Sequence, residues 1–317
     1  MTKRLDNPAV FLAPGILFLA ACSSGGGGAP SAAAPAPVAP TVATSGAQVN
    51  LQPANTAVTY QAASATALVT NAGVGGVAAA ASGQGATISI TTDATGLTKI
   101  VFNVPTTGAT FTQQYSFSVW DYGGPVSGTA PTTTNLVAIL RDVFGFPNTT
   151  GSVITQSIGP QSLNSAAYGF WASGDTATTG RAGTFAFGNL TPAASVPATG
   201  SATFNGSTIG VGGATGGSTA YALQGKAQIV ANFATQSATT NLTSLSTQNI
   251  STNVIGSLPD LTGTSTISGN AYTGSIAGTG LTGTINGNFY GPAAQETAGV
   301  WQVSGGGNAW IGSYGAK

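Results

Sequence analysis

The chain has 317 residues, of which 47 are glycine and only 4% are charged, and it contains no histidine. This composition excludes an imidazole base or metal ligand, and seven acidic residues make a carboxylate cluster for Ca²⁺ improbable. Seven basic residues are too few for a phosphate-binding surface, so we expect no nucleic-acid partner. From the composition as a whole we also expect no metal and no cofactor.

Residues 1–21 have the layout of a secretion signal, because Lys3 and Arg4 precede an apolar stretch that is too short to span a membrane. The segment Leu19-Ala20-Ala21-Cys22 matches the bacterial lipobox, in which the cysteine is acylated and becomes the new N-terminus. Cys22 is the single cysteine of the chain, which favours lipidation over the alternative of a buried thiol. We therefore expect cleavage after residue 21 and a lipid (palmitate-type) anchor at Cys22.

A lipid anchor with more than one acyl chain holds a protein stably at a membrane. Ser23 follows the cysteine, where Asp commonly favours retention at the inner membrane, so the outer membrane, and there the cell surface, is the expected location. Residues 22–49 are rich in Gly, Ala and Pro and predict a flexible linker.

Residues 50–197 predict a β-rich domain, because short aromatic and β-branched runs alternate with Gly, Asn and Thr. The expected strands are 86–92, 97–104, 110–122, 167–172 and 184–188, with 135–144 either a strand or a short helix. The alanine-rich region 53–80 fits neither pattern well. No long amphipathic helix is expected.

Residues 198–317 predict an antiparallel β-barrel of eight strands. The expected strands are 200–211, 225–233, 239–245, 263–268, 271–277, 282–290, 299–303 and 309–314. Eight strands close into a barrel whose interior side chains can fill. A membrane-spanning barrel is the less favoured alternative, because the outward positions carry Thr, Ser, Asn and Gln instead of an apolar band. The fold class is therefore all-β, with a soluble barrel.

The second half of the chain resembles a known family of surface lipoproteins. Its segments Gly200-Ser-Ala-Thr-Phe-Asn-Gly, Phe289-Tyr-Gly-Pro-Ala-Ala-Gln-Glu-Thr-Ala-Gly-Val-Trp and Gly312-Ser-Tyr-Gly look like the barrel domain of transferrin-binding protein B-like lipoproteins. Tyr168-Gly-Phe-Trp and Phe185-Ala-Phe-Gly resemble the end of the handle domain that precedes this barrel.

The resemblance implies a handle domain (50–197) and a barrel domain (198–317) displayed at the outer membrane. Relatives capture host iron carriers, complement regulators or haem, and some partner with a TonB-dependent transporter. The chain departs from the large receptors in having one lobe. Without His it could ligate haem only through another side chain, such as an axial Tyr.

Two groups of residues stand out as candidate sites. Glu296 is the single glutamate, and we expect it to cap backbone N–H groups in the turn after Gly291-Pro292, since no nearby residue completes a catalytic site. Four aromatic residues beside glycine turns are candidate binding anchors, although packing in the core is the commoner role for such side chains. They are Trp120, Tyr122, Phe144 and Phe146.

These observations predict a binding protein without catalytic residues. The expected ligand is a small molecule or a host or environmental protein, with nutrient or iron acquisition as the expected purpose. The alternative is a structural or adhesive coat module with no specific ligand. An enzyme is not expected, because no Ser-His, Ser-Lys or phosphate-loop motif occurs in the chain.

Overall fold

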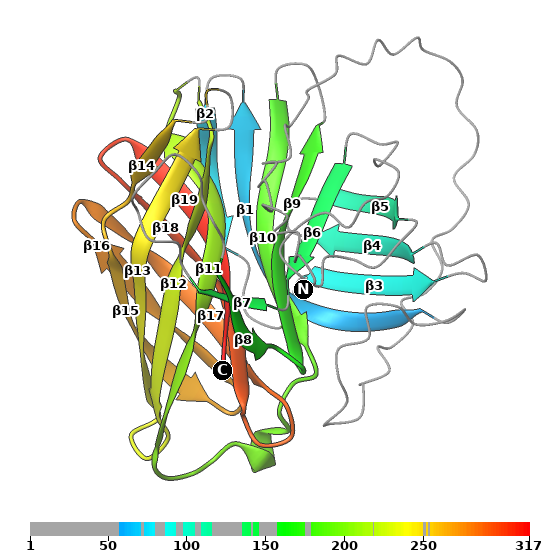
Figure 1. Cartoon of the computed structure of the whole chain (residues 1–317), viewed down its shortest axis with the longest axis vertical. Helices are drawn as coiled ribbons and strands as arrows, with labels where there is room; N and C mark the ends of the chain where they lie inside the picture. Colours follow the sequence, from blue (N-terminus) through cyan, green and yellow to red (C-terminus); the bar gives the residue numbers. More distant parts are fainter. Residues whose placement is uncertain are drawn as a thin grey trace, which may run out of the picture.

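The computed structural model describes residues 57–70, 73–79, 86–92, 98–104, 109–115, 135–140, 142–145, 157–174, 179–217, 219–249, 252 and 254–317. Within these ranges every element is a β-strand, apart from the short 3-10 helix η2 (Ala193–Ser195). A barrel on the left of Figure 1 lies against a second sheet on the right. Among the described residues, no helix has both the length and the apolar character needed to cross a membrane.

Eight antiparallel strands form the barrel. They are β11 (Ser201–Ala214), β12 (Tyr221–Asn232), β13 (Ser237–Asn249), β15 (Leu261–Ser268), β16 (Ala271–Gly278), β17 (Leu281–Tyr290), β18 (Glu296–Gly305) and β19 (Asn308–Ala316). Their order is β12-β11-β19-β18-β17-β16-β15-β13, and pairing between β12 and β13 closes the ring. A further short strand, β14 (Ile255–Ser257), pairs with the far end of β13.

All eight barrel strands predicted from the sequence are present. The alternation that predicts them has a physical cause: along β15, Leu261, Gly263, Ser265 and Ile267 are buried while the intervening residues are exposed. The largest difference in length is in β13, which continues to Asn249 beyond the expected end at residue 245. Ser244, with a φ of 54°, interrupts the alternation there.

The second sheet, here called the handle sheet, precedes the barrel in the chain. Its order is β5-β4-β3-β1-β10-β9-β6, and β2 also pairs with β1. The bounds are β1 (Val58–Thr70), β2 (Gly73–Ala79), β3 (Ala86–Thr92), β4 (Thr98–Val104), β5 (Ala109–Tyr115), β6 (Asn135–Leu140), β9 (Ala166–Gly174) and β10 (Thr179–Gly188). A separate hairpin joins β7 (Asp142–Gly145) to β8 (Ser157–Ser162).

The handle sheet confirms the expected strands within the described residues and decides two regions that the sequence left open. Residues 135–140 and 142–144 are strand, in β6 and β7, which decides for the strand over the short helix. The alanine-rich region 53–80, for which no pattern was decisive, contains β1 and β2. The expected strand 110–122 is described as far as Tyr115.

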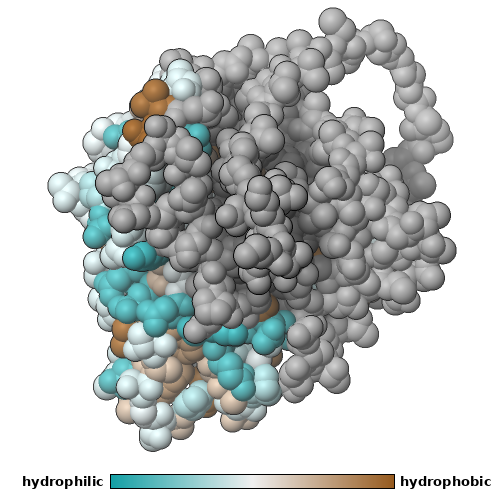
Figure 2. All heavy atoms as spheres, viewed as in Figure 1, coloured by the Kyte–Doolittle hydropathy of each residue, from teal (hydrophilic) through white to brown (hydrophobic). Residues whose placement is uncertain are grey.

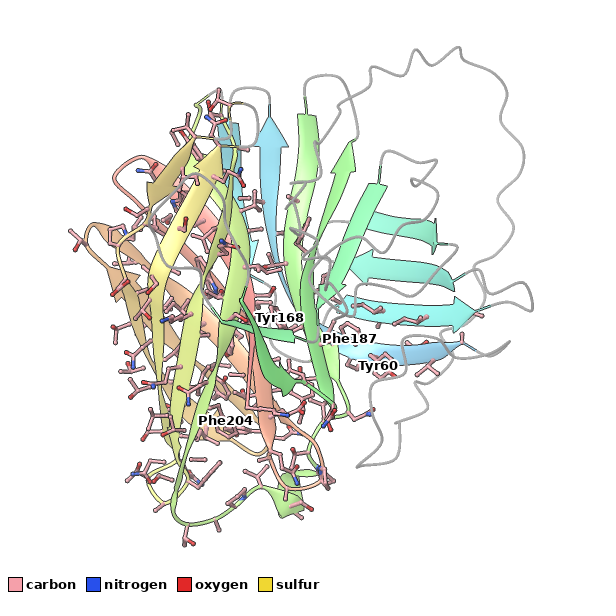
Figure 3. All side chains as sticks on the ribbon, viewed as in Figure 1. Tyr60, Tyr168, Phe187 and Phe204 are labelled. Carbon is pink, nitrogen blue, oxygen red and sulfur yellow. The ribbon has the colours of Figure 1, made fainter. Side chains whose placement is uncertain are left out.

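The two faces of β1 and β10 serve two different cores. Ala63, Ala65 and Ala67 face the barrel. On the opposite face the ring of Tyr60 lies 5.1 Å from that of Phe187. Figure 3 shows Tyr168 between the handle sheet and the barrel, whereas Tyr60 and Phe187 lie on the far side of the sheet.

Residues 189–200 connect the handle sheet to the barrel and are bonded to the end of β17. Leu190 forms an isolated bridge with Tyr290, and the Thr191 N–H donates to the Phe289 carbonyl at 2.9 Å. The Thr191 hydroxyl donates to the Gly291 carbonyl at 2.7 Å. The connection is therefore held on the barrel.

Candidate binding surface

The barrel interior is occupied by large side chains. The Phe289 ring is surrounded by three other rings, with the ring centroids of Phe204, Phe233 and Tyr272 at 5.9, 5.5 and 5.3 Å. Trp301 is fully buried in the same cluster, and its indole N–H donates to the Thr208 hydroxyl at 2.8 Å. Phe289 and Trp301 therefore fill the barrel interior.

A chain of hydroxyl groups crosses the interior. The Thr297 hydroxyl donates to the Asn288 carbonyl at 2.9 Å, so its oxygen accepts from Tyr272 at 2.7 Å. The Tyr272 oxygen in turn accepts from Tyr314 at 2.6 Å. Burial raises the pKa of Tyr272 to about 12 and that of Tyr314 well above its ordinary value. Both rings are therefore neutral structural groups at physiological pH.

Two glycines make room for these rings. A Cβ on Gly287 would lie 2.3 Å from the Tyr272 ring and from the Tyr314 hydroxyl oxygen. A Cβ on Gly312 would lie 2.2 Å from the indole of Trp301. These distances are far inside van der Waals contact, so both positions require glycine, and the aromatic filling depends on them.

The surface where the handle sheet packs on the barrel, here called the seam, is built mainly from small residues. On its handle side, Ala63, Ala65 and Ala67 of β1 are buried against barrel residues Val300, Ala309 and Ile311. A second cluster joins handle residues Leu163, Ala166, Tyr168 and Ala186 to Tyr290 and Ala298 of the barrel. Small side chains let the two sheets approach closely, and Tyr290 is a large side chain buried between them.

Glu296 bonds the barrel to the start of β9. One carboxylate oxygen accepts from the Asn164 N–H at 2.6 Å, and the other accepts from Ser165 and Ala166 at 2.8 and 2.9 Å. Glu296 is therefore a cap for backbone N–H groups, as expected, but the groups belong to the handle. The expectation that they lie in the turn after Gly291-Pro292 is wrong, because the side chain points away from its own turn across the seam.

Two further hydrogen bonds cross the seam. The Ser313 hydroxyl of β19 donates to the Gly169 carbonyl of β9 at 2.8 Å. The hydroxyl oxygens of Tyr168 and Ser207 lie 3.0 Å apart and are hydrogen-bonded to each other. The seam is thus fixed by buried polar contacts in addition to its alanines, which indicates a constant arrangement of the two sheets.

The part of the barrel wall that faces away from the handle is polar and almost uncharged. Its exposed side chains are mainly hydroxyl and amide groups, including Thr262, Thr264, Thr266, Ser268, Thr273, Ser275, Thr282, Thr284 and Gln228. Some are joined in register, as where Asn241 donates to Gln228 at 3.4 Å and Gln228 to Asn205 at 3.1 Å. Lys226 is the cation of this wall, which lacks the apolar band of a membrane-spanning barrel.

One end of the barrel carries an apolar edge at β14. Within the described ranges, the large hydrophobic side chains exposed to solvent are Val254, at 63%, and Ile255, at 46%. Figure 2 shows apolar atoms at the upper left, where Figure 1 places β14. The sequence patterns did not predict this edge, although two β-branched residues among Asn, Gly and Ser are a weak signal for it.

The residues predicted from the sequence as sites are mostly beyond what the structure describes. Cys22, Trp120, Tyr122 and Phe146 lie outside the described residues, and Phe144 is placed only as part of the backbone of β7. In the described portion of the chain, no group of three His, Cys, Asp or Glu residues is arranged to hold a metal ion.

Comparison with known proteins adds a family for the barrel. Residues 196–317 match the family model described as the C-lobe and N-lobe β-barrels of Tf-binding protein B. No curated protein sequence matches the chain.

Solved structures similar to the chain include a transferrin-binding protein B mutant from Haemophilus parasuis, at 14% identity over 84% of this chain and 77% of that one, with a TM-score of 0.39. The isotype 1 protein from Neisseria meningitidis gives 13% identity over 84% and 78%, with a TM-score of 0.38. HpuA from Kingella denitrificans, in complex with human haemoglobin, gives 15% over 71% and 86%, with a TM-score of 0.33. Because these TM-scores are low, the overlays carry no argument about function.

The family match and the barrel geometry agree on the same segment. The matched residues begin just before β11 and run through all eight strands of the closed barrel. Residues 196–317 therefore form a barrel domain of the transferrin-binding protein B-like family.

Proposed function

We propose that the chain is a non-catalytic lipoprotein that binds a protein ligand at the outer surface of the outer membrane. The observation that carries this proposal is a filled barrel of a family named for binding a protein. Because side chains occupy the interior, a ligand must be bound on the outer wall, at the ends of the barrel or on the handle. Surfaces of this size suit a macromolecule better than a small solute.

The charge distribution sharpens the proposal. Between residues 198 and 317 the charged residues are Lys226, Asp260, Glu296 and Lys317, and Glu296 is buried in the seam. With so few charges, Coulomb attraction contributes little to the binding free energy on this surface, so screening by salt changes that free energy little. We therefore expect the affinity for a true ligand to change by less than about tenfold between low and high ionic strength.

The test of binding uses the purified full-length chain immobilised on a sensor. Purified transferrin, iron-loaded and iron-free, is the first probe because the family name designates it, and growth medium or host fluid is the second. Saturable binding of a protein with a shallow salt dependence supports the proposal. Repeated failure with both probes would instead favour a coat or adhesive module with no specific ligand.

The anchor and the location are separate parts of the proposal, with their own tests. Cys22→Ala, or treatment with globomycin, should move the protein out of the membrane fraction. Protease added to intact cells should then digest the wild-type protein if it faces outward. An unchanged membrane distribution of the Cys22→Ala variant would reject lipid anchoring. The proposed partnership with a TonB-dependent transporter is tested by co-purification from solubilised outer membranes.

A further inference from the structure

The short strand β14 has one hydrogen-bonded edge and one free edge. Val254 accepts from Asn249 of β13, and Leu258 donates to Leu245, both at 2.9 Å. The backbone N–H and C=O groups of successive residues in a strand point to opposite sides. The N–H and C=O of Gly256 therefore also point toward β13, whereas those of Ile255 and Ser257 point away from it. β14 ends the strand order of its sheet, so no described strand pairs with these outward groups.

The barrel architecture explains why this edge is free. β13 pairs with β15 along its first half and with β14 along its second half. Between the two segments the Ser244 N–H donates to the Asp260 carboxylate at 3.0 Å, which fixes the irregularity. β16, the neighbour of β15, ends at Gly278 opposite Leu281 of β17 and does not reach the level of β14. The end of β13 and all of β14 therefore extend beyond their neighbours.

The free edge lacks the usual protection of an edge strand by charge. Natural edges carry Lys, inward charges or Pro, and here the segment Val254-Ile255-Gly256-Ser257 is uncharged. It also exposes Val254 and Ile255, which are the large apolar side chains open to solvent in the described part of the chain. An edge that offers both backbone groups and apolar side chains is suited to pairing with an extended polypeptide.

We propose that an extended, uncharged segment of the protein partner adds to the outer edge of β14 as a further antiparallel or parallel strand. The free N–H and C=O groups of Ile255 and Ser257 select a polypeptide backbone as the occupant, because they repeat at the two-residue spacing of a strand. Val254, Ile255, Gly256 and Ser257 carry no charge, so the edge itself favours an uncharged segment over a charged one. This inference rests on the proposed function as a protein-binding lipoprotein.

The two faces of β14 determine which side chains the added strand needs. Leu245 and Thr247 of β13 are buried, so their partners Leu258 and Gly256 share the face toward the barrel interior, while Ile255 lies on the outer face. Gly256 leaves a gap on the inner face, since a Cβ there would meet only the Thr247 hydroxyl, at 3.0 Å. A large apolar or aromatic side chain opposite Gly256 would fill this gap.

The test separates backbone pairing from side-chain contact at one position. Ile255→Pro removes the outward N–H and places a ring against the incoming strand, but leaves the bonds to β13 intact. Ile255→Val keeps the N–H and a β-branched side chain and is the matched control. The probe is the tightest binder selected from a displayed library of random linear peptides against the immobilised full-length chain.

We expect Ile255→Pro to weaken binding of this peptide by about tenfold or more, and Ile255→Val to change it by less than about threefold. The bound peptide should slow hydrogen exchange at Ile255 and Ser257 but not at Gly256, which is already bonded to β13. Equal binding of wild type and Ile255→Pro overturns the inference, as does a selection that yields no binder to this edge. A protein ligand that binds wild type and Ile255→Pro equally leaves the proposed function standing while the edge inference fails.

Discussion

The barrel interior and the seam are both fully buried, yet they are built in different ways. The interior is filled by Trp301, Phe289, Tyr272 and Tyr314, for which Gly287 and Gly312 make room. The seam is lined by alanines and relies on polar contacts such as the Glu296 carboxylate. One sheet, β11-β19-β18, supplies both, since its side chains alternate between the two sides.

This difference shows that a chain with few large side chains places most of them in the barrel interior and uses small ones in the seam. A closed barrel has a fixed inner diameter that only rings and branched chains fill. Two sheets packed face to face can instead reduce their separation until small side chains touch. We therefore expect the interior to tolerate loss of side-chain volume poorly and the seam to depend on individual hydrogen bonds. Single substitutions in each region can separate these two contributions to stability.

The largest effect should follow loss of a ring from the interior. Trp301→Ala removes a fully buried side chain and leaves the Thr208 hydroxyl without its donor, so we expect unfolding to become easier by about 3–5 kcal/mol. Urea unfolding followed by circular dichroism measures the change. Val254→Ala, at a position that is 63% exposed, is the control and should change stability by less than about 0.5 kcal/mol. Similar effects of the two variants would contradict a filled interior.

Loss of the carboxylate at the seam should have the next largest effect. Glu296→Ala leaves the N–H groups of Asn164, Ser165 and Ala166 without their acceptor, at a cost of about 2–3 kcal/mol. Hydrogen exchange should accelerate at these amides more than at the interior strand β17. Glu296→Gln keeps one carbonyl oxygen and should have a smaller effect. Uniform acceleration across both regions would show that the carboxylate is not specific to the seam.

The same contrast explains how much could be predicted from the sequence. Barrel strands such as Leu261–Ser268 were predictable because one face meets the filled interior and the other meets water. The weaker prediction was the end of β13, where Leu242 and Leu245 both point inward although they are three residues apart. The positive φ of Ser244 allows this, and a two-residue period cannot detect it.

The alanine-rich strand β1 was hidden from sequence analysis by the nature of the seam. Its buried face toward the barrel carries Ala63, Ala65 and Ala67, which differ little in hydrophobicity from the residues between them. The role of Glu296 as a cap followed from the lack of catalytic neighbours, but its partners, which lie about 130 residues away, did not. Sequence distance of this kind leaves no local pattern.

Raising the pH should weaken the interior through its buried tyrosines. Burial raises the pKa of Tyr272 from 10.0 to about 12 and shifts that of Tyr314 in the same direction. The folded state then holds protons that the unfolded state releases, so the contribution of these tyrosines to stability is constant below about pH 10 and falls between about pH 10 and 12, by up to about 1.4 kcal/mol per pH unit for each tyrosine. Urea unfolding at pH 8, 10 and 11 measures this slope.

A tyrosine substitution tests whether the loss of stability above pH 10 comes from the barrel interior. Tyr272→Phe removes one of the buried titrating tyrosines and should make the dependence above pH 10 less steep, although it loses hydrogen bonds to Thr297 and Tyr314 at every pH. Phe204→Leu, which alters the same interior without removing a titratable group, is the control and should keep the wild-type slope. A wild-type profile that is flat up to pH 11 would rule out the contribution of buried phenols.

The smallest effect has the opposite sign and lies in the seam. The Thr184 side chain is fully buried opposite Ala65, and its hydroxyl oxygen has no hydrogen-bond partner. Thr184→Val has the same shape without the unpaired hydroxyl, so we expect it to stabilise the protein by about 1 kcal/mol in urea unfolding. The matched control is Thr208→Val, which removes a hydroxyl that both accepts from Trp301 and donates to Ser313, and should destabilise. Stabilisation by Thr184→Val together with a loss in Thr208→Val would show that the unpaired hydroxyl of Thr184 lowers stability, whereas the hydrogen-bonded hydroxyl of Thr208 raises it. Destabilisation by both would mean that Thr184 has a partner in solution.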